Sequence, residues 1–535
     1  MSEEGQNKQP PVSQKSEGIP AGCVPSLAGK GVCVGKGSDG DDGGKGQKTH
    51  QEQWMKILMC STGTWSYGFM TAFTSVLAAD LSNNTTTLLG SDLILSDRQL
   101  DILNSLLIVG AFFGNLAISP IMSFAGRRPS VILATLFVLT SWLGVALIPS
   151  YFGILAARVI GGLGCGALDV AVVTFLAELS PTRKRGMATG MAGAGSMWGQ
   201  LVMFGMGCGN RYFTVAGFAM LVTVFVVPMM LLLPESPAFL ALKGKKEEAR
   251  KVLKLFRGAS VDVDAEIARY ITSDVNAPGV ARWRRLLEPD VLVPMLITVT
   301  LFILTFSTGG TVLITNSSRI LRMTHSPLPN NLTSVITMAV QMGACGVYLC
   351  LVDRIGRKPT LLLSYLMMST AMGGFTAYEY VASFGVSSFM NSSSQTNYFE
   401  GNITNLILHD PSLTAKAADQ YPGEIVALVM ERQYVPSSWI PLVCLAMAQA
   451  AYAMGLFSVP YLLANENFPS LIRPQACSIC VCAGTLSSIV NLQIFTPMLE
   501  TLTLLGLFGI YTTASIFGFI FTLVFLKETK NKLLS

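Results

Sequence analysis

The sequence predicts an all-α membrane protein whose twelve transmembrane helices form two six-helix bundles. Hydrophobic residues make up 51% of the 535 residues and charged residues only 13%, whereas soluble domains carry roughly 25% charged residues. A membrane-spanning helix needs about 20 apolar residues, so the chain has room for a dozen such helices. Charged motifs also recur in the same order in both halves, which is typical of two related bundles.

Twelve apolar stretches account for the predicted helices. They lie at 57–79, 98–120, 130–149, 152–177, 187–209, 212–233, 290–314, 333–352, 359–383, 438–464, 474–496 and 503–526. The chain therefore divides into a cytoplasmic tail at 1–55, an N-terminal bundle at 56–233, a cytoplasmic loop at 234–288, a C-terminal bundle at 289–527 and a second cytoplasmic tail at 528–535. The first tail is polar and lacks a long apolar run, which predicts disorder rather than a cleaved signal peptide.

The central loop is strongly basic but has an apolar face. Ala249, Val252, Leu253 and Phe256 recur at helical spacing among Lys, Arg and Glu residues. One side of each turn is therefore apolar, and short amphipathic helices are expected against the inner surface of the bundles.

Basic residues indicate the orientation of the helices. With the N-terminal tail assigned to the cytoplasm, the inner segments hold 30 Lys and Arg residues and the outer segments hold six, as the positive-inside rule requires. N-glycosylation sequons, which only outward-facing segments can use, fall in the segments assigned to the outside, at Asn83, Asn84, Asn331, Asn391 and Asn402. We therefore predict cytoplasmic termini and a glycosylated outer loop at 384–437. The plasma membrane is favoured, with an internal vesicle membrane as the alternative.

Internal repeats relate the two halves. Gly-Arg-Arg-Pro at 126–129, after the second helix, returns as Gly-Arg-Lys-Pro at 356–359, after the eighth. Glu-x-x-Pro-x-x-x-Arg at 178–185, after the fourth helix, returns at 466–473, after the tenth. A Glu closes the sixth helix and another closes the twelfth. Motifs that keep both their order and their side of the membrane indicate a duplicated bundle.

The repeated charges are interpreted as an inner gate. Carboxylates and guanidinium groups at the inner helix ends can pair, and pairs between the bundles would part when the gate opens, as alternating access requires. The alternative is that Arg and Lys only anchor the helix ends at lipid headgroups, which leaves the repeated Glu residues unexplained. The predicted gating charges are Arg127, Arg128, Arg158, Glu178, Arg185, Glu235, Asp353, Arg354, Arg357, Glu466, Arg473 and Glu528.

Taken together, these motifs resemble the sugar porter family of the major facilitator superfamily, over nearly everything after about residue 55. The resemblance also rests on Pro-Glu-Ser-Pro at 234–237, Asp-Arg-Ile-Gly-Arg-Lys at 353–358 and Arg158 within the fourth helix. It implies the major facilitator fold and movement of a small solute by alternating access. Animal facilitative hexose carriers and arthropod trehalose carriers are the most similar groups, which implies a hexose or trehalose as the solute.

The positions that contact sugar in this family are mostly different here. The seventh helix, which usually reads Gln-Gln-Leu-Ser-Gly-Ile-Asn, reads Leu-Thr-Phe-Ser-Thr-Gly-Gly at 304–310, and Gly193 replaces a Gln of the fifth helix. The Asp-Arg pair that usually precedes the first Gly-Arg-Arg has become Ser123-Phe124. By the resemblance, the residues left to contact the solute are Gln341, Tyr461, Ser307, Thr311 and Ser488.

Asp169 lies within the fourth helix, where the family usually has Thr or another small residue. A carboxylate near the middle of a bilayer costs about 2.5–3.5 kcal/mol on insertion scales, so it should face a wet cavity or a partner. One interpretation makes Asp169 a site of proton or cation coupling, because Met70 occupies the position where proton-coupled members keep Asp. The other pairs Asp169 structurally with a donor such as Asn104 or Asn115 of the second helix.

The sequence therefore predicts a facilitative solute carrier, with the lipid bilayer and a sugar as its partners. Two alternatives stay open. One is a proton- or cation-coupled symporter, or a carrier of a non-sugar organic solute, that uses Asp169; the other is a non-transporting sugar sensor. An enzyme is disfavoured, because His50, His325 and His409 stand in loops or the tail without metal spacing. No metal, cofactor or nucleic-acid partner is expected, since the basic residues do not collect on a soluble face.

Overall fold

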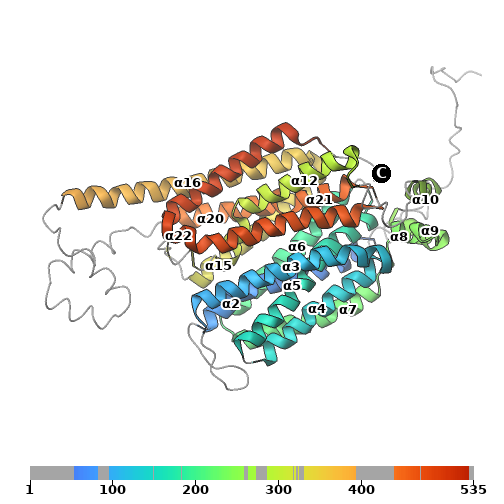
Figure 1. The fold of residues 1–535 in the computed structure, drawn as a ribbon, viewed down its shortest axis with the longest axis horizontal. Helices are drawn as coiled ribbons and strands as arrows, with labels where there is room; N and C mark the ends of the chain where they lie inside the picture. Colours follow the sequence, from blue (N-terminus) through green and yellow to red (C-terminus); the bar gives the residue numbers. More distant parts are fainter. Residues whose placement is uncertain are drawn as a thin grey trace, which may run out of the picture. The chain divides into compact units, whose positions relative to one another are not determined.

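The computed structural model of the protein consists of long helices that run side by side, with short helices at one end of them (Figure 1). It describes residues 53–81, 95–148, 150–181, 184–257, 263–272, 286–316, 319–320, 323, 330–392, 439–469 and 471–528. Within these ranges the regular structure is helical, without strands. Most of the predicted N-terminal tail and of the predicted outer loop lies outside the described residues.

Six long helices, coloured blue to green in Figure 1, form the N-terminal bundle. They are α2 (Gly63–Leu81), α3 (Asp97–Ala125), α4 (Arg127–Leu147), α5 (Tyr151–Leu179), α6 (Arg185–Gly207) and α7 (Tyr212–Leu231). Glycines let α5 approach α3 closely, because a Cβ at Gly162 or Gly166 would lie only 2.1 or 2.0 Å from a backbone oxygen of α3. Such small-residue contacts are how helices pack in lipid.

The C-terminal bundle, yellow to red in Figure 1, repeats this layout with several spans interrupted. Its elements are α12 (Pro289–Ser307), α13 (Gly310–Thr315), α15 (Asn330–Ile355), α16 (Arg357–Ser392), α20 (Ile440–Ala451), the π-helical turn η2 (Tyr452–Leu456), α21 (Ser458–Glu466) and α22 (Arg473–Phe525). The predicted helix 290–314 is broken at Gly309, whose φ of 83° is a conformation that glycine adopts without steric cost. The predicted helices 474–496 and 503–526 are continuous in α22 except at Thr503, which leaves helical geometry.

The connection between the bundles forms α8 (Pro237–Leu242), α9 (Lys246–Arg257) and α10 (Val263–Thr272). These helices lie at one end of the long helices (Figure 1). Ala249 and Leu253 of α9 are buried while Lys251 and Lys254 are exposed, so this helix has one buried apolar face and one exposed basic face. We call this end of the bundles the charged end. It also bears the motif residues 123–128, 178–181, 184–187, 353–358, 466–469 and 471–475.

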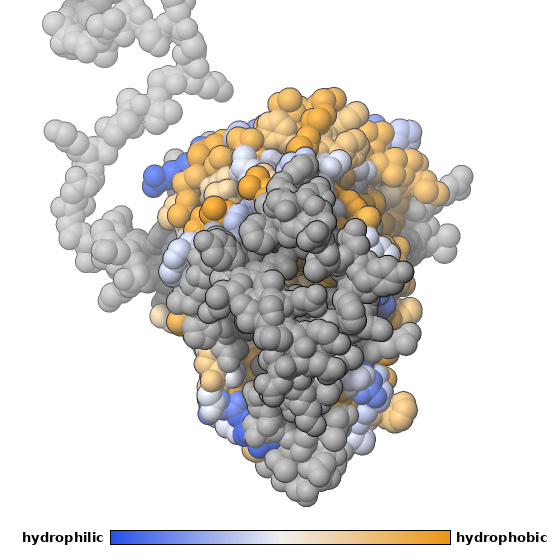
Figure 2. All heavy atoms as spheres, turned by 90° about the vertical axis from the view of Figure 1, so that its left-hand side faces the viewer, coloured by the Kyte–Doolittle hydropathy of each residue, from blue (hydrophilic) through white to orange (hydrophobic). Residues whose placement is uncertain are grey.

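The long helices have the length and surface of membrane spans. Eight helical stretches among the described residues are long and apolar enough to cross a membrane. One of these is α22, in which Thr503 separates two helices. The helices α2, α6 and α16, with 19, 23 and 36 residues, are long enough to supply three more spans. Large apolar side chains such as Phe113, Phe225 and Phe517 are exposed, and hydrophobic residues predominate over the upper part of the molecule in Figure 2. An apolar surface of this extent marks contact with lipid, and the prediction of twelve transmembrane helices in two six-helix bundles is confirmed.

Candidate functional site

A cavity lies between the two bundles. Its volume is about 70 Å³, which is room for several water molecules. The N-terminal bundle lines it with residues of α2, α3, α5 and α6, and the C-terminal bundle with residues of α12, α13, α15, η2, α21 and α22. Because both bundles line it, a relative movement of the bundles can change which end of the cavity is open.

Four of the five predicted solute contacts line this cavity. They are Gln341, Tyr461, Thr311 and Ser488. Ser307 lies outside the lining, contrary to the expectation. Its hydroxyl is 3.1 Å from that of Ser487, because α12 ends at this residue and directs the side chain toward α22.

The sequence-based reasoning missed a glutamine in the lining. Gln200 lies seven residues after Gly193, which is about two helical turns and therefore the same face of α6. Gln200 lines the main cavity, whereas Gly193 lines a smaller cavity next to it. An amide of α6 therefore faces the cavity, two turns further along the helix than the family pattern indicates. The signal for it in the sequence is the seven-residue spacing, which puts Gln200 on the same helical face as Gly193.

Aromatic rings form one wall of the cavity. Tyr452, Phe457 and Tyr461 follow one another along η2 and α21, with 5.7 Å between each pair of neighbouring ring centroids. Phe306 lines the cavity from α12, and Tyr67 lines it from α2 in the other bundle. Such rings offer flat apolar faces to a ring-shaped solute.

Several buried polar atoms around the cavity have no partner among the residues that the structure describes. They are Oδ1 of Asn115, Oγ of Ser196, Oε1 of Gln200 and both amide atoms of Gln341. The other amide atom of Asn115 is engaged, since its Nδ2 donates to Oγ1 of Thr485 at 3.0 Å. A buried polar atom without a hydrogen bond costs about 1–3 kcal/mol, so these atoms favour a ligand that brings hydrogen-bonding groups.

Asp169 faces the cavity and bonds across the bundle interface. The Tyr461 hydroxyl donates to its Oδ2 at 2.6 Å, which joins α21 to α5. Both residues also line the smaller cavity, of about 20 Å³. The pair therefore lies at the boundary between the two cavities. The expected donor Asn115 instead bonds Thr485.

Arg158 is buried inside the N-terminal bundle. Its guanidinium donates to the carbonyl oxygen of Met70 at 2.9 Å and to the hydroxyl of Thr74, both on α2. It also lies 5.4 Å from the centre of the Phe73 ring. These contacts join α5 to α2 within one bundle, so Arg158 is not placed between the bundles as its inclusion among the gating charges assumed.

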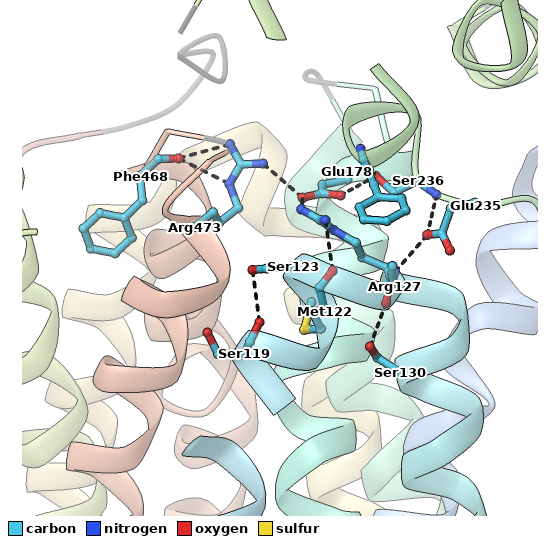
Figure 3. A network of polar contacts seen from close by, with 12 residues as sticks. Ser119, Met122, Ser123, Arg127, Ser130, Glu178, Glu235, Ser236, Phe468 and Arg473 are labelled. Carbon is cyan, nitrogen blue, oxygen red and sulfur yellow. Dashed lines mark hydrogen bonds and ion pairs between the residues drawn. The ribbon is translucent and has the colours of Figure 1, made fainter. Parts of the chain in front are cut away.

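At the charged end, Arg127 and Glu178 pair within the N-terminal bundle (Figure 3). Nη2 of Arg127 lies 2.9 Å from Oε1 of Glu178, and both side chains are buried. The Ser236 hydroxyl also donates to Glu178. Glu235 accepts the backbone N–H of Arg127 at 2.9 Å and so caps the start of α4, where the helix dipole favours a carboxylate.

The C-terminal bundle repeats this arrangement. Arg357 lies 2.7 Å from Glu466, and Glu528 accepts the backbone N–H of Arg357 at 3.0 Å at the start of α16. The preceding glycines, Gly126 and Gly356, adopt φ values of 109° and 113°, which glycine adopts readily. The repeated motif thus forms the same capped helix start twice.

At the charged end, the carboxylates of Glu178 and Asp353 make contacts that cross between the bundles. Nη1 of Arg473, at the start of α22, lies 3.6 Å from Oε1 of Glu178, at the end of α5 (Figure 3). The Asp353 carboxylate of α15 accepts the backbone N–H groups of Gly186 at 3.2 Å and Met187 at 2.8 Å, at the start of α6. The charged end is therefore closed in this structure.

A third contact between the bundles is neutral. Nε2 of Gln475, near the start of α22, donates to Oγ of Ser123 at 3.1 Å. Ser123 precedes Gly126 by three residues, as Asp353 precedes Gly356 in the other half. The two halves thus place different groups at equivalent positions, a carboxylate in one and a hydroxyl in the other.

Two other predicted gating charges donate to backbone carbonyls of their own bundle. Arg128 donates to the Leu231 carbonyl at 2.6 Å, and Nε of Arg185 donates to the Ala177 carbonyl at 3.3 Å. Arg354 is exposed in the last turn of α15.

The predicted glycosylation sites stay predictions. Asn83, Asn84 and Asn402 lie outside the described residues. Asn331 lies in the first turn of α15, and Asn391 lies in the last turn of α16, which ends nine residues beyond its predicted boundary.

Comparisons with known proteins agree with this architecture. The family described as "Sugar (and other) transporter" matches residues 56–396 and 420–535. The chain is 24% identical to a facilitated trehalose transporter of Bombyx mori, over 92% of this chain and 88% of that protein. It is 22% identical to a facilitated trehalose transporter of Polypedilum vanderplanki, over 90% of this chain and 86% of that protein.

Two solved structures share the fold. One is the proton:xylose symporter XylE bound to 6-bromo-6-deoxy-D-glucose, with a TM-score of 0.71 at 18% identity over 91% of this chain and 98% of that one. The other is the inward-open conformation of the xylose transporter XylE from E. coli, with a TM-score of 0.60 at 18% identity. This match covers 90% of this chain and 98% of that one. The family match spans both bundles. The protein is therefore a multi-pass membrane transporter, not an enzyme, and it belongs to the sugar (and other) transporter family.

Proposed function

We propose that the protein is a uniporter that carries a hexose or trehalose down its gradient by alternating access. The observation that carries this proposal is the set of unpartnered buried atoms around the cavity, on Asn115, Ser196, Gln200 and Gln341. A sugar brings several hydroxyls, each of which can donate and accept, and so can satisfy amides and hydroxyls together. The aromatic wall offers a surface for the apolar faces of a sugar ring. The similarity to trehalose transporters supports the same class of solute.

The contacts that cross between the bundles at the charged end form the proposed gate. In this proposal, Arg473–Glu178 and the Asp353 contact with the start of α6 break when the charged end opens, because they join opposite bundles. Arg127 and Arg357 keep their partners within one bundle throughout the cycle. They hold Glu178 and Glu466 in place and limit the number of charges left unpaired in the open state.

The charged end faces the cytoplasm in this proposal. It carries the basic helix α9 and both repeats of the Gly-Arg motif, and basic residues favour the cytoplasmic side. Glu528 contacts the start of α16 at the same end, which places the end of α22 there too. The end of α16 with Asn391 and the segment after it with Asn402 then lie outside, and the plasma membrane is favoured over an internal vesicle membrane.

The test is uptake by purified full-length protein in liposomes, with labelled glucose and trehalose and a panel of organic anions and cations. We expect saturable uptake of a neutral sugar that Gln341→Ala weakens through a higher KM. Gln449, a buried glutamine of α20 outside the cavity lining, supplies the matched control Gln449→Ala. Sugar binding without any flux would instead favour a sensor.

A further inference from the structure

The cavities contain one carboxyl group and no basic side chain that could pair with it. Of the described residues that line the two cavities, Asp169 is the only carboxylate, and none is Lys, Arg or His. The hydrogen-bond partner of Asp169 is the neutral hydroxyl of Tyr461. A carboxylate at this depth costs about 2.5–3.5 kcal/mol, and a threonine or asparagine could bond the same hydroxyl at a lower cost. A carboxylate in this place is therefore best stabilised by a positively charged ligand.

The surroundings of Asp169 favour an organic cation over a metal ion. Tyr67 and Phe457 line both cavities together with Asp169 and Tyr461, and an aromatic face attracts an ammonium group through its electron-rich ring. Metal cations such as Ca²⁺ take several oxygen ligands. In the part of the chain that the structure describes, no group of three or more His, Cys, Asp or Glu side chains comes together.

The same cavity also presents groups for hydroxyls. Gln341 and Asn115 are each only 1% exposed and have unpartnered amide atoms, and both line the cavity with Asp169. A ligand that satisfies all three residues has an ammonium group and several hydroxyls. We propose that the preferred solute is an amino sugar in its protonated form, with its ammonium on Asp169 and its hydroxyls on these amides. The inference rests on the proposed sugar transport and narrows its substrate class.

The position of the pair explains what the amine would do during transport. The Asp169–Tyr461 bond joins opposite bundles at the boundary between the cavities, so it has to break when α21 moves away from α5. An ammonium group supplies three donors and leaves the carboxylate neutralised after the phenol has gone. A neutral sugar leaves that carboxylate without a cation. The amine should therefore favour both binding and the movement of the bundles.

The experiment compares labelled glucosamine with labelled glucose in liposomes that hold the full-length protein. The two solutes differ by an ammonium group in place of one hydroxyl. We expect a KM at least tenfold lower for glucosamine. Asp169→Asn should abolish this difference while glucose uptake persists, and Asp169→Glu should keep part of it. Asp290→Asn removes an exposed carboxylate in the first turn of α12 and should leave the difference unchanged.

Three outcomes overturn the inference. Equal KM values for glucosamine and glucose in the wild type, or a preference for glucosamine that survives Asp169→Asn, would show that the carboxylate does not recognise the amine. Either result would leave the proposed sugar transport intact. Uphill uptake of glucose under a proton gradient, lost in Asp169→Asn, would assign the carboxylate to a proton. Absence of uptake for every solute would refute the proposed function as well. If Asp169→Asn does not fold, thermal stabilisation of the wild type decides the matter, because glucosamine should stabilise it at lower concentrations than glucose does.

Discussion

The hydroxyl of Tyr461 donates to the carboxylate of Asp169 at 2.6 Å and thereby joins α21 of one bundle to α5 of the other. Arg473 and Glu178 also join the two bundles, as an ion pair at 3.6 Å at the charged end. The pair of Arg357 and Glu466, although shorter at 2.7 Å, lies within one bundle. A transport cycle has to break the first two contacts and can leave the third intact. Variants that remove a contact between the bundles should therefore change the ratio of closed to open molecules. Variants that remove a contact within one bundle should lower the stability of that bundle.

Tyr461→Phe should destabilise the closed structure, because the ring stays while Asp169 loses its donor. A buried acceptor left without its hydrogen bond costs about 1–3 kcal/mol. We expect a lower melting temperature for the purified variant in detergent. Tyr348→Phe is the matched control, since the Tyr348 hydroxyl is buried without a partner among the described residues. Equal melting temperatures for the two variants would mean that the Asp169–Tyr461 bond contributes little.

Arg473→Ala should open the charged end, because it removes a contact that exists only while that end is closed. A loss of about 1.4 kcal/mol would change the ratio of closed to open molecules tenfold. The buried thiol of Cys477, one turn further along α22, reports on the opening. We expect faster labelling of Cys477 by a polar maleimide, measured by mass spectrometry of its peptide.

The control for this prediction is Arg128→Ala, which removes an arginine whose contact to Leu231 lies within one bundle. It should leave labelling of Cys477 unchanged. Normal expression of Arg473→Ala with unchanged labelling would show that the arginine serves only to anchor the helix end.

Ser123→Asp should have the opposite effect to Arg473→Ala. It places a carboxylate near the start of α22, at the position equivalent to Asp353 in the other half. A carboxylate near a helix N-terminus contributes about 0.3–1 kcal/mol, so the closed charged end should become more populated. Labelling of Cys477 should slow down and uptake should slow with it. Ser123→Asn, which has nearly the same shape without the charge, should behave like the wild type; faster labelling in Ser123→Asp would refute the equivalence of the two positions.

The proposed orientation predicts sugar chains at the end of α16, on Asn391, and on the segment after it, on Asn402. Protein expressed in animal cells should gain mobility on a gel after treatment with an N-glycosidase, and the gain should be smaller for the double variant Asn391→Gln with Asn402→Gln. The measurement is the mobility with and without enzyme. A wild type that is unaffected in cells that glycosylate a control membrane protein would count against placing this segment outside.

The sequence predicts the repeated elements well, because each is specified locally. Gly126 and Gly356 stand before equivalent arginines, and the structure gives both glycines positive φ and caps both following helices with a glutamate. Continuous hydrophobicity, in contrast, hides the break at Gly309 and the π-helical turn η2, since an apolar run has the same pattern whether or not it is interrupted.

The site was harder to predict because its contacts join distant parts of the chain. Asp169 and Tyr461 are 292 residues apart, and no local pattern shows that they meet. Gln200 was not predicted because the family pattern indicates Gly193, and Gln200 lies two turns away on the same face of α6. The structure brings the predicted gating charges together at one end of the bundles, Arg158 excepted. Which of them pair within a bundle and which pair between bundles depends on packing that the motifs do not encode.

The most direct test of the account is the end point of sugar uptake into liposomes that contain the purified protein. A carrier that moves a sugar down its gradient should bring labelled glucose or trehalose to the same concentration inside and outside, faster than protein-free liposomes, and an imposed proton gradient should not raise this level. It should also show counterflow, with labelled sugar entering transiently against its gradient when unlabelled sugar is loaded inside. Uptake no faster than in protein-free liposomes, or an internal concentration that exceeds the external one only under a proton gradient, would contradict facilitative sugar transport.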